Sequence, residues 1–234
     1  MGFSPIWDEN YKQSLELSIW PWDEVVGLTH RYCQIKSSMI VLELGCGAGA
    51  NIPFFASIGA DYYAIEGSAH IVSQLQNSFK SDKIHITCGD FTKSFKFDEL
   101  IGRVDLIIDR AALTINTTQG IKNAINLVKS YLKPGGKFIG FDWYSLDSDY
   151  FKAKDKTTID SHTFKFNSGL LAGYGNVHGS DEAHIRELFS EFEIEYITKN
   201  SKTELIPVPF RRSLFSFVAV KNQRRKYGIF KRVE

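Results

Sequence analysis

The chain has 234 residues, of which 43% are hydrophobic, so it is long and apolar enough to bury a full core. This length predicts one α/β domain with additions rather than two independent domains. The formal net charge of +1 gives no global sign of a polyanionic partner, so nucleic-acid binding is not expected.

Strand and helix patterns alternate along most of the chain. Residues 1–36 are rich in Trp and predict helical packing ahead of the first strand. Short apolar runs predict buried parallel strands, and amphipathic spacing predicts the helices between them. The expected order is strand 39–44, helix 51–58, strand 61–65, helix 69–79, strand 83–88, strand 104–108, helix 118–132, a Lys-Pro-Gly-Gly turn at 133–136 and strand 138–141.

The alternation breaks at residues 145–180, which are polar with scattered aromatics and end in a glycine cluster. We interpret them as an insertion over the ligand edge of the sheet. A helix at 181–189, capped by Ser180, and an antiparallel pair of strands at 191–198 and 213–220 complete the chain. The sequence therefore predicts an α/β fold with a doubly wound, Rossmann-like sheet of seven strands, mostly parallel with an antiparallel closing strand.

A glycine-rich turn, residues 45–50, follows the first predicted strand, where ligands of such sheets bind. Its spacing fits the G-x-G-x-x-G/A pattern of dinucleotide sites, and a purely structural tight turn is a further alternative. Glu43 stands two residues before the turn, and its carboxylate would repel a pyrophosphate at the following helix. S-adenosylmethionine carries no phosphate and is positive at its sulfonium and ammonium groups. Glu43 therefore favours S-adenosylmethionine over NAD as the ligand.

Acidic residues also stand at the ends of the next three predicted strands. Glu66 is near the spacing of an acid that binds ribose hydroxyls. Asp90 can accept a hydrogen bond from an adenine amino group, with Phe91 packed on the ring. Asp109 would face the methionine half of the ligand or the methyl acceptor. Any one of these acids could be an ordinary surface residue, but four at successive strand ends indicate a site.

Residues 41–143 resemble class I S-adenosylmethionine-dependent methyltransferases of the small-molecule type. Val41–Gly49 is similar to the first motif of that family, Ile65-Glu66 to the second, Gly89-Asp90-Phe91 to the third and Leu132–Lys137 to the turn before the fifth strand. The resemblance implies that Glu43 and Gly45 contact the methionine moiety, Glu66 the ribose, and Asp90 with Phe91 the adenine. The other residues expected at the cofactor are Tyr11, Trp20, Cys46, Gly47, Asn51, Gly67, Asp109, Arg110 and Ala111.

The fourth strand ends in Asp109-Arg110-Ala111-Ala112 and lacks the Asn/Asp-Pro-Pro-aromatic motif of enzymes that methylate amino groups of bases or glutamine. It is similar to the matching segment of thiopurine-type enzymes. We expect a helical lid at 1–36, a methyltransferase domain at 37–220 with its insertion over the acceptor site, and a basic tail at 221–234. Tyr11 and Trp20 would close the lid, although packing on the sheet explains these rings equally well.

Methyl transfer is an in-line displacement on an activated carbon, so the enzyme mainly aligns donor and acceptor. A general base helps when the acceptor is a hydroxyl or a protonated amine. Because histidine titrates in the useful range, His178 is the first candidate base and Asp142 the second. No metal ligand set is recognised, because the three cysteines at 33, 46 and 88 lack zinc-site spacing.

The expected acceptor is a small molecule, and the glycine-rich insertion with Gly175–His178 resembles enzymes that act on a sugar or a sugar-linked metabolite. Alternatives are methylation of RNA or protein through the basic tail, an NAD-dependent oxidoreductase, and a non-catalytic partner that keeps the fold. A monomer or a homodimer is expected. The first residues do not form a signal peptide, and no apolar run reaches the ~20 residues that span a bilayer, so we expect a cytoplasmic protein without membrane insertion.

Overall fold

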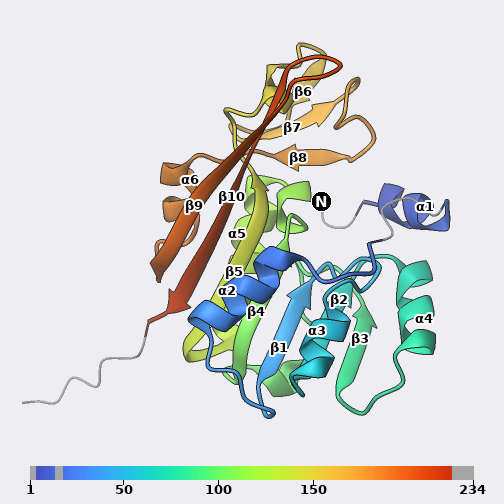
Figure 1. Cartoon of the computed structure of the whole chain (residues 1–234), viewed down its shortest axis with the longest axis vertical. Helices are drawn as coiled ribbons and strands as arrows, with labels where there is room; N and C mark the ends of the chain where they lie inside the picture. The colour runs from blue at the N-terminus through green and yellow to red at the C-terminus, as the bar shows by residue number, and fades with distance from the viewer. Residues whose placement is uncertain (1–3, 14–17, 223–234) are drawn as a thin grey trace, which may run out of the picture.

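A sheet of seven strands organises the computed structural model, which describes residues 4–13 and 18–222 (Figure 1). Its strands follow the order β3-β2-β1-β4-β5-β10-β9. The first five of these pair in parallel, and β10 runs antiparallel to both of its neighbours. The strands are β1 (Ile40–Leu44), β2 (Asp61–Glu66), β3 (Ile84–Cys88), β4 (Val104–Arg110), β5 (Leu132–Tyr144), β9 (Phe192–Glu204) and β10 (Phe210–Lys221).

Helices cover both faces of this sheet and give three layers. The buried residues of α2 (Asp23–Tyr32), α3 (Ile52–Ser57) and α4 (Ala69–Ser78) pack in one core on one face. Those of α5 (Thr118–Tyr131) and α6 (Glu182–Leu188) pack in a second core on the other face. The α/β fold class and the seven-stranded, mostly parallel sheet predicted from the sequence are therefore confirmed.

Several element boundaries differ from prediction, among them the start of β5 and the cap of α6. The Lys-Pro-Gly-Gly turn ends α5 as expected, but β5 already begins at Leu132, and the turn is a bulge inside this strand. Val104 of β4 pairs with Leu132 while Leu106 pairs with Lys137, so the intervening residues leave the ladder. The cap of α6 is Asp181, not Ser180, because the Asp181 carboxylate accepts a hydrogen bond from His184 N at 2.7 Å.

The segment after β5 forms a small antiparallel sheet, which the sequence did not predict. Its strands are β6 (Lys156–Thr158), β7 (Thr163–Phe166) and β8 (Asn176–His178). This sheet has its own apolar cluster, which includes Phe151, Phe166 and Val177. In Figure 1 it lies beyond the carboxyl ends of the parallel strands, beside the far end of the long β9–β10 hairpin.

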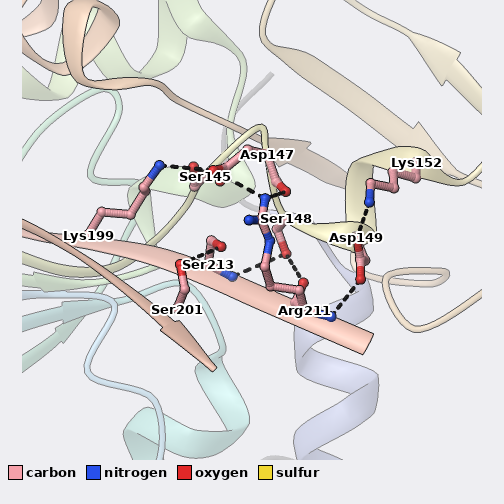
Figure 2. Close-up of polar contacts among 9 residues, drawn as sticks. All are labelled: Ser145, Asp147, Ser148, Asp149, Lys152, Lys199, Ser201, Arg211 and Ser213. Atoms are coloured by element: carbon pink, nitrogen blue, oxygen red, sulfur yellow. Dashed lines mark hydrogen bonds and ion pairs between the residues drawn. The ribbon is translucent and has the colours of Figure 1, made fainter. Parts of the chain in front are cut away.

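Polar contacts attach the start of this segment to the hairpin (Figure 2). The Arg211 guanidinium donates to the Asp147 carbonyl oxygen at 2.7 Å, and Arg211 N donates to the Asp149 carboxylate at 2.5 Å. Lys199 on β9 pairs with the Asp147 carboxylate at 2.9 Å. The segment that carries the small sheet is thus held at a fixed place relative to β10, which matters because Tyr150 and Tyr174 of this segment line one cavity with Arg212 and Leu214 of β10.

The short helix α1 (Ile6–Lys12) lies at the amino end of α4. Asp8 accepts a hydrogen bond from Ser68 Oγ at 2.5 Å and from His70 N at 3.3 Å. Trp7 meets Tyr174 of the small sheet's loop edge to face, with ring centres 5.3 Å apart. Helix α1 therefore bridges the start of α4 and the loop before β8.

Two further expectations concern membrane insertion and the basic tail. Within residues 4–13 and 18–222, no helix combines the length and apolar character needed to cross a bilayer. The expected basic tail at 221–234 lies almost wholly outside the described residues, of which only its first two are part.

Candidate active site

A cavity of about 340 Å³ opens at the carboxyl ends of the parallel strands. The glycine turn and the ends of β2, β4 and β5 form one side, whereas α1, the small-sheet segment and β10 form the other. Most residues expected at the cofactor line it, together with the candidate catalytic Asp142. The expected residues that line the cavity are Tyr11, Glu43, Gly45, Cys46, Gly47, Asn51, Glu66, Gly67, Phe91, Arg110, Ala111 and Asp142.

The glycine turn brings backbone closer to its surroundings than any side chain would permit. Gly45 and Gly47 have φ of +67° and +52°, a region that glycine adopts without strain. A Cβ on Gly45 would lie 2.4 Å from the Ala112 Cβ, and one on Gly47 would lie 3.0 Å from the Tyr11 hydroxyl. The turn can therefore pack this closely against Ala112 and Tyr11 only because both positions are glycine.

Glu43 is a buried carboxylate at the end of β1, 3% exposed. It accepts hydrogen bonds from Asn51 Nδ2 at 2.8 Å and from the Tyr62 hydroxyl at 2.5 Å. Burial raises the pKa of Glu43 to about 7, although these two hydrogen bonds oppose the shift. A cation bound against this carboxylate would recover the free energy that burial costs, which suits a positively charged ligand.

Glu66 is the last residue of β2, and its carboxylate connects the glycine turn to the start of α4. Its carboxylate accepts from Gly47 N at 3.0 Å and from Ser68 N at 2.9 Å. Burial raises the pKa of Glu66, and the backbone hydrogen bonds lower it in part. The side chain thus has a fixed orientation at the cavity wall.

Asp90 and Asp109, the other two acids expected at the site, are not among the residues that line the cavity. Asp90 accepts hydrogen bonds from Thr92 and pairs with Lys93 at 3.0 Å. Asp109 is fully buried and accepts from Trp143 Nε1 at 2.7 Å and from Leu113 N at 2.9 Å. Burial raises the pKa of Asp109 to about 7. Both acids hold the loops after their strands, and Phe91 lines the cavity in place of Asp90.

Arg110, Asp142 and Trp22 form a cluster at the ends of β4 and β5. Arg110 Nε donates to Asp142 Oδ2 at 2.8 Å, and the Arg110 guanidinium carbon lies 3.6 Å from the centre of the Trp22 ring. Ala111 and Asp142 have φ of +55° and +59°, which is unusual for residues with a Cβ. Two strained residues facing one cavity indicate a functional constraint at this edge.

Beyond this cluster the cavity is lined by aromatic rings. Tyr144 and Tyr150 meet edge to face, with ring centres 5.8 Å apart, and Arg212 and Leu214 of β10 line the wall beside them. Trp7 and Tyr174 close the side formed by α1. Arg212 lacked any sequence signal, because an alternating strand does not reveal which face meets a distant pocket.

The predicted lid residue Trp20 also lies away from the cavity. Trp20 is 75% exposed and does not line it, whereas the neighbouring Trp22 does. The Trp22 backbone N donates to Asn51 Oδ1 at 3.3 Å, which joins this segment to the Glu43 hydrogen bonds.

His178, the first candidate base, is fully buried in a cluster of three histidines on the small sheet and α6. His178 Nε2 is 3.1 Å from His184 Nε2, and the rings of His162 and His184 stack with centres 3.6 Å apart. Burial lowers the pKa of His178 to about 3. It does not face the cavity, so its expected place beside the acceptor is corrected because strand β8 turns this side chain inward.

Neither the cysteines nor any cluster of potential metal ligands forms a second functional site within the described part of the chain. Cys33, Cys46 and Cys88 are free thiols, and burial raises the pKa of Cys46 at the cavity wall well above its ordinary value. No group of three or more His, Cys, Asp or Glu side chains among the described residues has an arrangement that could hold a metal ion.

Comparison with known proteins finds a matching domain model and several similar folds. Residues 41–136 match the model of a methyltransferase domain. A similar structure is a SAM-dependent methyltransferase from Methanosarcina mazei, with a TM-score of 0.69 and 18% identity over 87% of this chain and 99% of that one. Another, from Clostridium acetobutylicum, has a TM-score of 0.62 and 15% identity over 93% and 96%.

A third similar structure belongs to work on the conversion of a disulfide bond into a thioacetal group during echinomycin biosynthesis. It has a TM-score of 0.66 and 15% identity, over 95% of this chain and 94% of that one. No curated protein sequence gives a significant match. The matched domain, the sheet order and the glycine turn all agree with a class I methyltransferase that uses S-adenosylmethionine as its cofactor.

Proposed function

We propose that this enzyme transfers the methyl group to a small-molecule acceptor, and that a sugar or sugar-linked metabolite fits best. The observation that carries the proposal is the contact between α1 and the loop before β8 at the cavity wall. Trp7 and Tyr174 both line the cavity and their rings are in contact, so a folded macromolecule approaching from this side would have to separate them to reach the glycine turn. The aromatic wall of Tyr144 and Tyr150 suits the apolar faces of sugar rings.

The donor would occupy the glycine-turn end of the cavity. We propose that Glu43 and Gly45 hold the methionine moiety, Glu66 the ribose, and Phe91 the adenine ring. The buried acids and the glycines at positions 45 and 47 fit a ligand that is cationic and closely held. Tyr11 would lie over the donor, since its hydroxyl is packed against Gly47.

The bound cofactor supplies a methyl group already activated by its sulfonium, and the protein supplies alignment. Bringing donor and acceptor together at a fixed orientation removes much of the entropic cost of the reaction. We propose that Asp142 acts mainly by positioning Arg110, because its Oδ2 is already engaged by the guanidinium. Arg110 and Trp22 then form the wall between donor and acceptor.

The similar structure from echinomycin biosynthesis supports this proposal by analogy, since that work concerns chemistry on a small natural product. The alternative of RNA or protein methylation rests on the basic tail, whose residues 223–234 lie outside the described structure. The alternative of an NAD-dependent oxidoreductase rested on the spacing of the glycine turn. The methyltransferase-domain match includes this turn, so the spacing does not favour NAD.

The test is transfer of label from S-adenosylmethionine, labelled in its methyl group, to a cell extract separated into small molecules and macromolecules. We expect label in the small-molecule fraction, and we expect the chain truncated after residue 221 to transfer it equally well. Label found only in RNA or protein, and lost on truncation, would overturn the proposal in favour of the macromolecular alternative.

A further inference from the structure

We infer that the acceptor carries an anionic group, a carboxylate or a phosphate, and that Arg212 binds this group at the end of the cavity far from the glycine turn. This inference rests on the proposed small-molecule acceptor and adds its chemical class. It assigns a binding role to a residue of the closing hairpin, outside the matched residues 41–136.

The register of three adjacent strands fixes where Arg212 lies relative to the donor end. Arg110 at the end of β4 pairs with Phe141 of β5, next to Asp142. Further along β5, Tyr144 pairs with Leu214 of β10. Arg212 precedes Leu214 by two residues and shares its face of β10, because side chains alternate along a strand. The cavity wall therefore runs from Arg110 past Tyr144 to Arg212.

Negative and positive side chains lie at opposite ends of this wall. The two buried acids that line the cavity, Glu43 and Glu66, stand at the glycine-turn end. The charge of Arg110 is matched at 2.8 Å by Asp142. Among the described lining residues, this leaves Arg212 as a cation whose ion-pair partner, Glu204, is not part of the wall. An anionic acceptor would be attracted to Arg212 and repelled by the acids, which orients its neutral end toward the donor.

The Arg212–Glu204 pair can give way to a ligand. Its nitrogen and oxygen are 2.9 Å apart, but the two side chains are 43% and 46% exposed, so water screens their attraction. Surface pairs of this kind contribute about 0–1 kcal/mol, whereas a bidentate bond from guanidinium to carboxylate or phosphate inside a cavity is stronger. Tyr150 stands beside Arg212 and can add a hydroxyl to the same anion.

The test compares three sugars that share one ring and differ in charge: glucose, glucuronate and glucose 6-phosphate. Each is titrated into the full chain saturated with S-adenosylhomocysteine. We expect the carboxylate or the phosphate sugar to bind at least about ten-fold more tightly than glucose, because a charge-assisted pair contributes that much. The stronger of the two identifies which anion the site accepts.

Two variants separate the role of Arg212 from a general effect of charge. Arg212→Met should remove the preference for the anionic sugars and leave the affinity for S-adenosylhomocysteine unchanged. Arg186→Met is the matched control, because Arg186 forms a similar exposed pair with Glu182 on α6. It should keep the preference.

The inference is overturned if neither anionic sugar binds more tightly than glucose, or if the preference survives in Arg212→Met. The proposed function fails by a different result, namely methyl label confined to RNA or protein in the transfer experiment. The two failures are therefore distinguishable.

Discussion

Asp142 Oδ2 accepts a hydrogen bond from Arg110 Nε at 2.8 Å, so the one candidate base that lines the cavity is already committed to a cation. Asp142→Asn keeps an oxygen that can accept this bond. We expect kcat to fall less than about ten-fold, with the same pH profile, because a general base would contribute about 10²–10⁴-fold. Steady-state kinetics of wild type and variant from pH 6 to 9 check this, and a fall of a hundred-fold or more would restore Asp142 as the base.

The binding of S-adenosylmethionine should depend on pH through Glu43. Burial raises the pKa of this carboxyl to about 7, and a cationic ligand favours its charged form. Binding below pH 7 therefore releases a proton, and affinity should fall as the pH drops from 7.5 to 6, by at most about ten-fold per unit.

Titration calorimetry at several pH values measures this slope. Glu43→Gln should bind more weakly and show a smaller slope, because the titrating group is gone. A slope that is equal in wild type and Glu43→Gln would show that another group, such as Glu66, is responsible.

Gly45 should tolerate alanine far less well than a glycine of the same backbone conformation in open space. Its φ is +67°, and a Cβ would meet Ala112 at 2.4 Å. Gly102 has φ +72° with no atom within 4 Å of a Cβ, so Gly102→Ala is the matched control. Left-handed strain costs about 1–2 kcal/mol in both, and overpacking adds about 1–3 kcal/mol in Gly45→Ala alone.

Denaturant unfolding and S-adenosylhomocysteine titration of both variants give the comparison. Weak binding is expected only for Gly45→Ala. Equal stability and equal affinity in the two variants would contradict the close approach at the turn.

The histidine cluster should make the fold sensitive to mild acid. Burial lowers the pKa of His178 to about 3 and that of His184 below its usual range. In the unfolded chain these groups take up protons below about pH 6.5, whereas in the folded protein His178 stays neutral to about pH 3 and His184 takes up its proton at a lower pH than in the unfolded chain. Stability is thus lost as the pH falls below 6.5, by up to about 1.4 kcal/mol per unit for each group.

His178→Asn can keep a hydrogen bond to Thr163, which is 3.1 Å from His178 Nδ1. Its free energy of unfolding should decrease less than that of wild type between pH 6.5 and 5. Parallel curves for the two proteins would show that His178 does not titrate on unfolding.

The pattern of apolar residues predicted the sheet well. Strands that are buried on both faces of a sheet are apolar along their whole length, and here these runs end in a glycine or an acidic residue. It placed Glu43, Glu66 and the glycine turn at one edge, since parallel strands share their carboxyl ends. The same reasoning placed Asp109 there, yet the side chain turns into the core toward Trp143. Strand ends specify an edge of the sheet, but the direction of each side chain depends on the loop that follows.

The acceptor side could not be predicted in this way. The small sheet has strands of three or four residues, too short for a clear alternation. His178 was chosen for its chemistry, and only tertiary packing shows that it stacks among other histidines. Trp22 rather than Trp20 meets Arg110, because the chain direction before α2 decides which ring turns inward.

The most direct test of the central claim is titration calorimetry of the full chain with S-adenosylhomocysteine and, separately, with NAD. Glu66→Gln is the matched variant, because it keeps the size of a side chain that holds Gly47 N at 3.0 Å and faces the expected ribose. The structure predicts one S-adenosylhomocysteine site in the wild type, affinity at least about ten-fold weaker in Glu66→Gln, and no NAD binding. Tight NAD binding without S-adenosylhomocysteine binding, or equal affinity in wild type and variant, would contradict the assignment of this cavity to the methyl donor.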